Sequence, residues 1–213
     1  MKRAYDLVIF DCDGTLVDSE PLTNRLIAEM INELNISIDT KTCLGLFAGK
    51  TIGHITTFIK EQGVFIDDKK FEVSYRERCF ALFNDELKPI SGVGDLLKGL
   101  TVPYCVASNA PKRKMEITLP ATGLAKYFSE DRIFSAYDVQ QWKPEPALFL
   151  YAAQKMNVHP SRCLVIEDTW SGAMGAVNAQ MDVLGYNPHG DWQLYIDGVP
   201  NFTKMKDIQN YLL

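Results

Sequence analysis

Short apolar runs that end at polar residues recur along the chain. They read YDLVIF before Asp11, VPYCVAS before Asn109, CLVIE before Asp168 and DVLGY near Asn187. Their nearly continuous apolar character indicates strands that are buried on both faces, as in a parallel sheet. The segments between them, such as EPALFLYAAQKMN and SGAMGAVNAQM, have helical spacing. This alternation predicts an α/β fold with a doubly wound parallel sheet.

Residues 18–87 interrupt this alternation with helical patterns alone. The segments EPLTNRLIAEMINELN, KTIGHITTFIKEQG and DKKFEVSYRERCFALFNDEL all repeat their apolar residues every three or four positions. We therefore predict a small α-helical cap domain, residues 18–87, inserted after the first strand. The α/β core domain would then comprise residues 1–17 and 88–213, with Pro89 and Gly92 marking the return to it.

Composition narrows the class of protein. The chain has 213 residues, 46% hydrophobic and 23% charged, which is ordinary for a globular protein. Its net charge of −5 argues against nucleic-acid or membrane partners. No apolar run could cross a bilayer and no signal peptide follows Met1, so we expect a cytoplasmic protein, a monomer or a weak dimer. Five cysteines without a CxxC pair predict reduced thiols rather than disulfides or zinc ligands.

Polar residues gather where the predicted strands end, and ligands of open α/β sheets bind beyond the carboxyl ends of the strands. These residues are Asp11, Asp13, Ser108, Asn109, Glu167 and Asp168, and Lys143 lies in QWKPEP before another helix. Carboxylates so grouped would repel one another unless a cation joins them. An all-oxygen set favours Mg²⁺, the usual metal partner of phosphate substrates, over zinc.

The spacing of Asp11 and Asp13 would allow the two carboxylates to take different roles in one reaction. Residues i and i+2 of an extended chain point to the same side, so both carboxylates can face one cavity. One could attack phosphorus to form an aspartyl phosphate, while the other serves as general acid and then as general base. The Gly14–Thr15 turn would bring backbone N–H groups to phosphate oxygens, and Thr15 adds a hydroxyl.

Each of these residues also has a structural alternative. The aspartate pair could form a turn after a strand, and Glu167–Asp168 could cap the following helix. Ser108 and Asn109 could simply begin a turn. Lys143 could be a solvated surface lysine. The basic run at residues 112–114 is interpreted as the solvated start of a helix, with steering of phosphate as the lesser alternative.

Four segments together resemble one family. DCDGTLVDS, ASN, WKPEP and VIEDTWSG occur in the order, and at the strand ends, of the haloacid dehalogenase superfamily of phosphotransferases. The chain is most similar to the β-phosphoglucomutase-like branch, which has a small helical cap. The resemblance covers essentially the whole chain.

The resemblance implies a role for each acidic residue. Asp11 would be the nucleophile and Asp13 the general acid and base. Mg²⁺ would be held by Asp11, by the backbone carbonyl of Asp13 and by Asp168. Glu167 would lie beside the metal, as a ligand itself or through water.

The resemblance also implies how phosphate is bound. Ser108 would bind a phosphate oxygen with help from Asn109, and Lys143 would bridge the nucleophile and the phosphate. Their charges and donors match the needs of phosphoryl transfer, which depends on positioning and charge neutralisation.

Departures from the relatives indicate which reaction is catalysed. Dehalogenases and phosphonatases lack the second aspartate, so Asp13 indicates an oxygen leaving group that needs a proton. β-Phosphoglucomutases carry a His and an Arg where this chain has Thr23 and Ile52. Lys50 and Thr51 remain in the loop FAGKTIGH, where they could reach a substrate carboxylate, hydroxyl or second phosphate. This loop resembles that of sugar-phosphate and 6-phosphogluconate phosphatases.

The sequence thus predicts a Mg²⁺-dependent phosphatase that hydrolyses a small phosphorylated metabolite, a sugar or sugar-acid phosphate. Thr15, Lys50 and Asn109 are the predicted substrate-binding residues. Two alternatives remain open: a phosphomutase, and a catalytically silent binding protein with the same fold.

Overall fold

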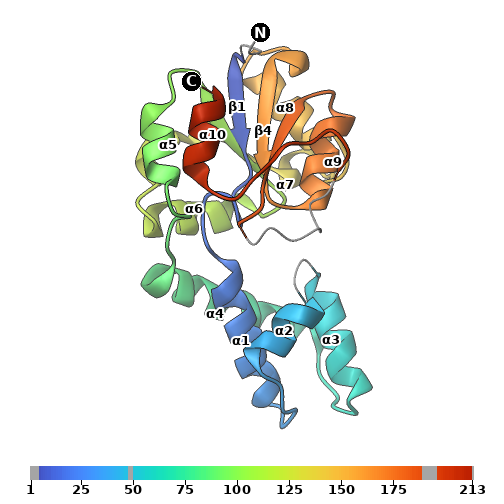
Figure 1. Cartoon of the computed structure of the whole chain (residues 1–213). Coiled ribbons are helices and arrows are strands. Elements are labelled where there is room, and N and C mark those ends of the chain that lie inside the picture. Colours follow the sequence, from blue (N-terminus) through green and yellow to red (C-terminus); the bar gives the residue numbers. More distant parts are fainter. Residues whose placement is uncertain (1–4, 48–49, 189–195, 213) are drawn as a thin grey trace. The chain divides into compact units, whose positions relative to one another are not determined.

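The computed structural model describes residues 5–47, 50–188 and 196–212. Contacts divide the chain into two compact units (Figure 1). One comprises Met1–Val17 and Lys88–Leu213 and is called the α/β unit below; the other, Asp18–Leu87, is called the helical unit. The predicted fold class is confirmed, whereas the roles of core and cap stay a prediction.

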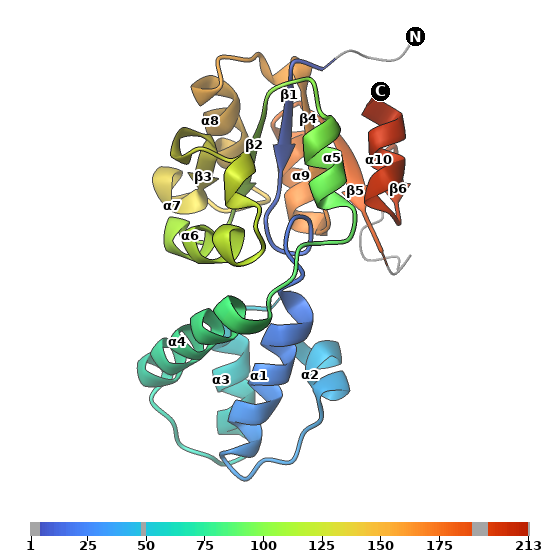
Figure 2. The same ribbon diagram turned by 90° about the vertical axis from the view of Figure 1, so that its left-hand side faces the viewer.

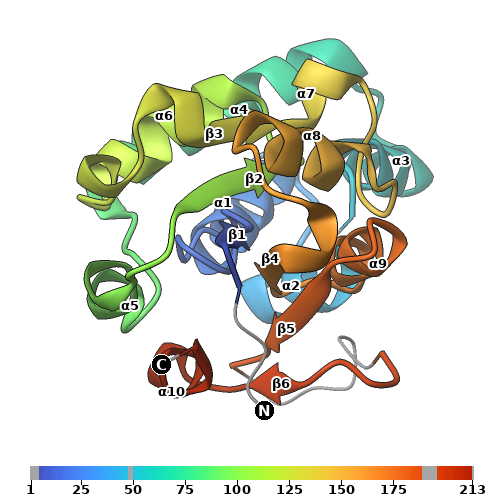
Figure 3. The same ribbon diagram turned by 90° about the horizontal axis from the view of Figure 1, so that it is seen from above.

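The α/β unit is built on a six-stranded sheet in which every neighbouring pair is parallel. The strand order is β3-β2-β1-β4-β5-β6, and Figure 3 shows it in a view down the strands. The strands are β1 Leu7–Phe10, β2 Tyr104–Ser108, β3 Ile133–Ser135, β4 Cys163–Glu167, β5 Asp182–Tyr186 and β6 Asn201–Phe202. The apolar runs predicted β1, β2, β4 and β5. They did not predict β3 and β6, which are too short to show a pattern.

Helices cover both faces of this sheet (Figures 2 and 3). On one face lie α5 Val93–Gly99, α6 Lys112–Ala121 and α10 Met205–Leu212; on the other lie α8 Ala147–Lys155 and α9 Trp170–Asn178. Shorter pieces are α7 Ala136–Val139 and the 3₁₀ turns Ala125–Tyr127, Glu130–Arg132 and Pro160–Arg162. The sheet is therefore doubly wound, as its apolar strands require.

One part of the core lies where the sheet packs on α8 and α9. Leu7 and Ile9 of β1 join Phe149 and Ala152 of α8 in one buried cluster. The alternate β1 residues on the opposite face are buried as well, so the whole strand is shielded from water. A strand so fixed holds the residue that follows it in a defined position.

The helical unit consists of α1 Glu20–Asn32, α2 Thr40–Phe47, α3 Ile52–Glu61 and α4 Asp68–Glu86. Helix α1 packs against both α2 and α4. The sequence pattern did not predict α2, whose residues TKTCLGLF include weak helix formers. Tertiary packing stabilises it instead, because Cys43 and Phe47 are buried.

Among the described residues, no helix is both long and apolar enough to cross a bilayer. All five cysteines are free and buried.

Phe149 and Leu150 provide a matched test of this core. Phe149 is fully buried and its ring lies 4.9 Å from Lys143 Nζ, whereas the adjacent Leu150 is 39% exposed. Phe149→Ala should lower the free energy of unfolding by about 3–5 kcal/mol, because it leaves a cavity under the sheet. Leu150→Ala should change it by less than about 1 kcal/mol. Equal losses in urea unfolding of the two variants would contradict this account.

Candidate active site

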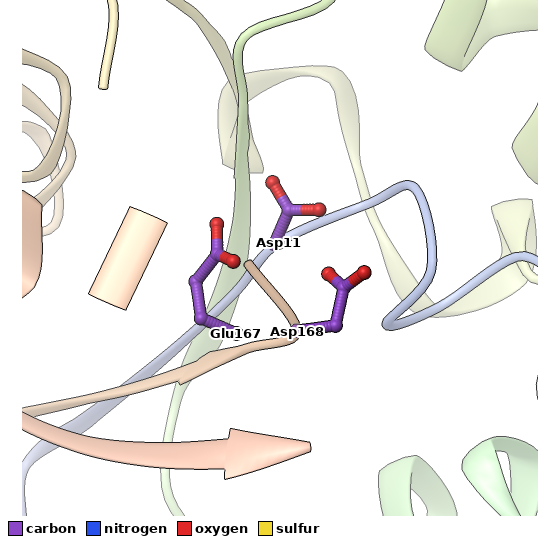
Figure 4. A group of neighbouring side chains, drawn as sticks. All are labelled: Asp11, Glu167 and Asp168. Atoms are coloured by element: carbon purple, nitrogen blue, oxygen red, sulfur yellow. The ribbon is translucent and has the colours of Figure 1, made fainter. Parts of the chain in front are cut away.

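The ends of β1 and β4 bring three carboxylates together. Strand pairing aligns Phe10 with Ile166, and the Asp11 backbone N–H donates to the Ile166 carbonyl at 2.9 Å. Asp11 therefore lies beside Glu167 and Asp168. Each of the three offers an oxygen within 4.8 Å of the other two, and Figure 4 shows them converging.

Burial makes Asp11 and Asp168 weaker acids than exposed aspartates. It raises the pKa of Asp11, with Lys143 opposing the shift and Glu167 adding to it. Burial likewise raises the pKa of Asp168 well above its ordinary value, reinforced by Glu167 and Asp11. A divalent cation would reverse this cost, since it favours the ionised forms. Three carboxylate oxygens in one small cluster, two of them on buried residues, suit a hard cation such as Mg²⁺.

Lys143 is the buried cation of the site. Its Nζ donates to Asp11 Oδ1 and, at 2.7 Å, to Glu167 Oε1, and its side chain is only 2% exposed. Burial alone would lower the pKa of Lys143, but the charges of Asp11 and Glu167 hold it above its ordinary value. The amino group thus stays charged and holds one oxygen of Asp11 in place.

Glu167 is bound on both of its oxygens. Oε1 accepts from Lys143, and Oε2 accepts from the Thr169 backbone N–H at 2.8 Å and from its hydroxyl at 2.9 Å. Thr169 also caps α9, its hydroxyl accepting from the Gly172 N–H at 3.1 Å. Sequence reasoning considered Glu167–Asp168 for this cap, but the cap is Thr169, a residue type that is also favoured there. Whether Glu167 contacts the metal stays a prediction.

The Gly14–Thr15 turn packs against Asp168. Gly14 has a φ of +81°, and a Cβ there would lie 2.0 Å from Asp168 Oδ2. The buried Thr15 hydroxyl donates to Asp168 Oδ1 at 3.0 Å. The turn therefore positions this carboxylate, while the predicted contact of Thr15 with substrate stays a prediction.

Ser108 ends β2, which lies on the other side of β1 from β4, and Asn109 follows it. Ser108 is 2% exposed, and its hydroxyl accepts from the Ala110 N–H at 3.1 Å. Asn109 Oδ1 accepts from the Lys143 backbone N–H at 2.9 Å. Asn109 therefore links β2 to the loop that carries Lys143. Their contacts with phosphate stay predictions.

Asp13 is paired with a lysine that sequence reasoning did not assign to the site. Lys114 Nζ lies 2.7 Å from Asp13 Oδ1. Lys114 belongs to the basic run interpreted as a solvated helix start, and no local motif connects it to Asp13. Only the packing of α6 places it here.

Lys50 lies in the helical unit, where it lines a small pocket of about 110 Å³. Thr23 and Ile52 line the same pocket. At these two positions the sequence resemblance predicts a His and an Arg in the β-phosphoglucomutases, and that alignment stays a prediction. The pocket is lined by Glu20, Thr23, Asn24, Ile27, Phe47, Lys50, Ile52, Ile55 and Tyr75.

Gly172 and Gly94 test how tightly Glu167 is enclosed. A Cβ at Gly172 would lie 1.8 Å from Glu167 Oε1, whereas one at Gly94 in α5 would meet nothing within 4 Å. Gly172→Ala should lower the free energy of unfolding by about 1–3 kcal/mol, because Glu167 cannot move without losing Lys143. Gly94→Ala should leave it unchanged or raise it by up to about 1 kcal/mol. Urea unfolding checks both, and a harmless Gly172→Ala would refute the close packing.

The chain is similar to known phosphatases in sequence. A family model described as haloacid dehalogenase-like hydrolase matches residues 5–180. A 6-phosphogluconate phosphatase of Escherichia coli K12 is 38% identical, over 86% of this chain and 84% of its own. A fructose-1-phosphate phosphatase of the same organism is 28% identical, over 86% of this chain and 97% of its own.

Solved structures agree with this relationship. A conserved haloacid dehalogenase-like protein of Agrobacterium tumefaciens superposes with a TM-score of 0.82 at 29% identity, covering 97% of each chain. β-Phosphoglucomutase-like proteins are also among the structural neighbours. The resemblance inferred from the four sequence segments is confirmed. The chain belongs to the haloacid dehalogenase-like hydrolases.

Proposed function

We propose that this protein is a Mg²⁺-dependent phosphatase that hydrolyses a small sugar or sugar-acid phosphate through an aspartyl-phosphate intermediate. The family and the curated relatives support the reaction class, a phosphoric monoester hydrolase. The observation that carries the mechanism is the pairing of Asp11 with the buried Lys143, with Asp13 two residues further on. A carboxylate so oriented is suited to nucleophilic attack.

Asp11 and Asp13 divide the two steps of the reaction. An Asp11 oxygen forms a bond to phosphorus while the ester P–O bond breaks, and Asp13 gives its proton to the leaving oxygen. Asp13, now ionised, takes a proton from a water that attacks the aspartyl phosphate. Phosphate then leaves and the Asp11 carboxylate is restored. Lys143 keeps Asp11 oriented throughout.

The metal would be held by Asp11, Asp168 and the backbone carbonyl of Asp13, with Glu167 bound directly or through water. Mg²⁺ there would supply charge neutralisation for the transferred phosphoryl group. Thr15 and Gly14 hold Asp168 in place for this role. Ser108 and Asn109 would donate to the phosphate oxygens.

The helical unit would choose the substrate. Its pocket combines the Lys50 side chain with polar groups such as Thr23, a combination suited to a carboxylate or hydroxyls. The relatives named for 6-phosphogluconate and fructose 1-phosphate support a sugar acid or sugar. Ile52 offers no charge for a second phosphate, which supports hydrolysis over mutase chemistry. A cytoplasmic location and a monomeric or weakly dimeric state stay predictions.

Asp11→Asn tests the nucleophile. Phosphate release from 6-phosphogluconate in Mg²⁺ should fall by at least about a thousandfold, because an amide cannot form the phosphoenzyme. Removal of divalent ions with EDTA should likewise stop the wild-type enzyme, and added Mg²⁺ should restore it.

Asp95→Asn is the control, since it removes the same charge from an exposed position on α5. It should retain wild-type activity. Full activity of Asp11→Asn would contradict the mechanism. Isomerisation of a sugar phosphate without phosphate release would identify a mutase, and binding without turnover of any phosphate ester would identify a silent protein.

Lys50→Met tests substrate selection. The KM for 6-phosphogluconate should rise about tenfold or more, because one charge-assisted hydrogen bond to the carboxylate is lost. The KM for p-nitrophenyl phosphate, which has no carboxylate, should stay constant. Lys41→Met removes an exposed lysine from the same unit and should change neither constant. A parallel loss on both substrates would refute a role in recognising the carboxylate.

A further inference from the structure

Lys114 forms an ion pair with the candidate general acid. Its Nζ lies 2.7 Å from Asp13 Oδ1, with the two side chains 23% and 30% exposed. Its neighbour Lys112 is 44% exposed and lies 3.7 Å from Asp138. Lys112 is therefore solvated, as predicted for the start of this helix, whereas Lys114 is largely shielded and paired with Asp13.

The position of Lys114 in α6 is not explained by the stability of the helix. The first turn of α6 holds Lys112, Arg113 and Lys114 and contains no acidic residue. Positive side chains are unfavourable there, because the N-terminal end of a helix already carries partial positive charge. The Asp13 carboxylate compensates the charge of Lys114, so the favourable interaction of this lysine lies with the active-site loop.

Helix α6 contacts two successive residues of the loop after β1, Cys12 and Asp13. Lys114 and Thr118 are four positions apart and lie on one face of the helix. Thr118 Oγ1 is 4.0 Å from Cys12 Sγ, and both residues are buried. Met115, fully buried, anchors the intervening turn. The amino group of Lys114 is therefore carried on a helix that packs directly against Cys12 and Asp13.

The two aspartates have different lysines. Lys143 contacts Asp11 and Glu167, whereas Lys114 contacts Asp13. The two carboxylates have different tasks in the proposed reaction: one must attack, and the other must hand over a proton. A separate lysine for each allows the two orientations to be set independently.

We propose that Lys114 is a positioning residue that holds the Asp13 carboxyl group in the orientation from which it passes its proton to the leaving oxygen. This inference rests on the proposed phosphatase function. Because Lys114 Nζ lies against Oδ1, the transferred proton in the proposed step is carried by Oδ2 of Asp13. The proton moves from there to the leaving oxygen as the P–O bond breaks, and Lys114 keeps its own protons throughout.

The test compares aryl phosphates whose leaving groups need a proton to different degrees. The value of kcat/KM reports the steps up to formation of the phosphoenzyme. A basic leaving group such as phenolate requires more proton transfer than p-nitrophenolate does. In Lys114→Met, kcat/KM should fall about tenfold or more for phenyl phosphate but less than about threefold for p-nitrophenyl phosphate. Lys114→Arg should recover much of the loss, because it keeps a donor to Asp13.

Lys112→Met is the matched control. It removes the same charge from the same turn of α6 but leaves the contact with Asp13 intact. Its dependence on the leaving group should equal that of the wild type. Thermal unfolding checks that the variants are folded, and Lys114→Gln serves the same test if the Met variant is not.

Each outcome is decisive. An equal fractional loss on every aryl phosphate in Lys114→Met would overturn the role of Lys114. So would a selective loss on phenyl phosphate in Lys112→Met. Either result would leave the proposed phosphatase function standing. A wild type that hydrolyses no phosphate ester in Mg²⁺ would overturn the proposed function and this inference with it. A selective loss on phenyl phosphate that arginine reverses supports both.

Discussion

The candidate site depends on one buried cation held between two carboxylates. Lys143 lies between Asp11 and Glu167 with almost no exposure to solvent. Burying any of these three groups alone would be costly, but as a hydrogen-bonded set they compensate one another. The arrangement exists because β1 and β4 are neighbours in the sheet, so their carboxyl ends deliver Asp11 and Glu167 to the same place.

Close backbone packing then positions the remaining acidic groups. The Gly14–Thr15 turn approaches Asp168 at a distance that excludes a Cβ, and Gly172 leaves the space that Glu167 occupies. These contacts leave the carboxylates little freedom to relax apart, so mutual repulsion adds to burial in raising the pKa values of Asp11 and Asp168. The same constraint makes the cluster receptive to a hard divalent cation.

In the proposed function, the α/β unit carries out the reaction and the helical unit selects the substrate. The residues proposed to bind phosphate and move protons belong to the α/β unit, in which strands β1 and β4 are buried along their whole length. The pocket with Lys50 belongs to the helical unit, which has its own packing. Such a division lets substrate preference change without disturbing the reacting groups, since few residues would serve both tasks.

The sequence by itself determined the α/β alternation, the helical insertion, the family and the acidic residues at strand ends, because apolar runs and short motifs are local signals. It did not reveal β3, β6 or α2, whose few residues carry no periodicity and are stabilised by neighbours. Nor did it reveal that Thr15 holds Asp168, that Asn109 binds the Lys143 loop, or that Lys114 meets Asp13. Those contacts join residues 34 to 153 positions apart or depend on how α6 packs, so only the tertiary structure could decide them.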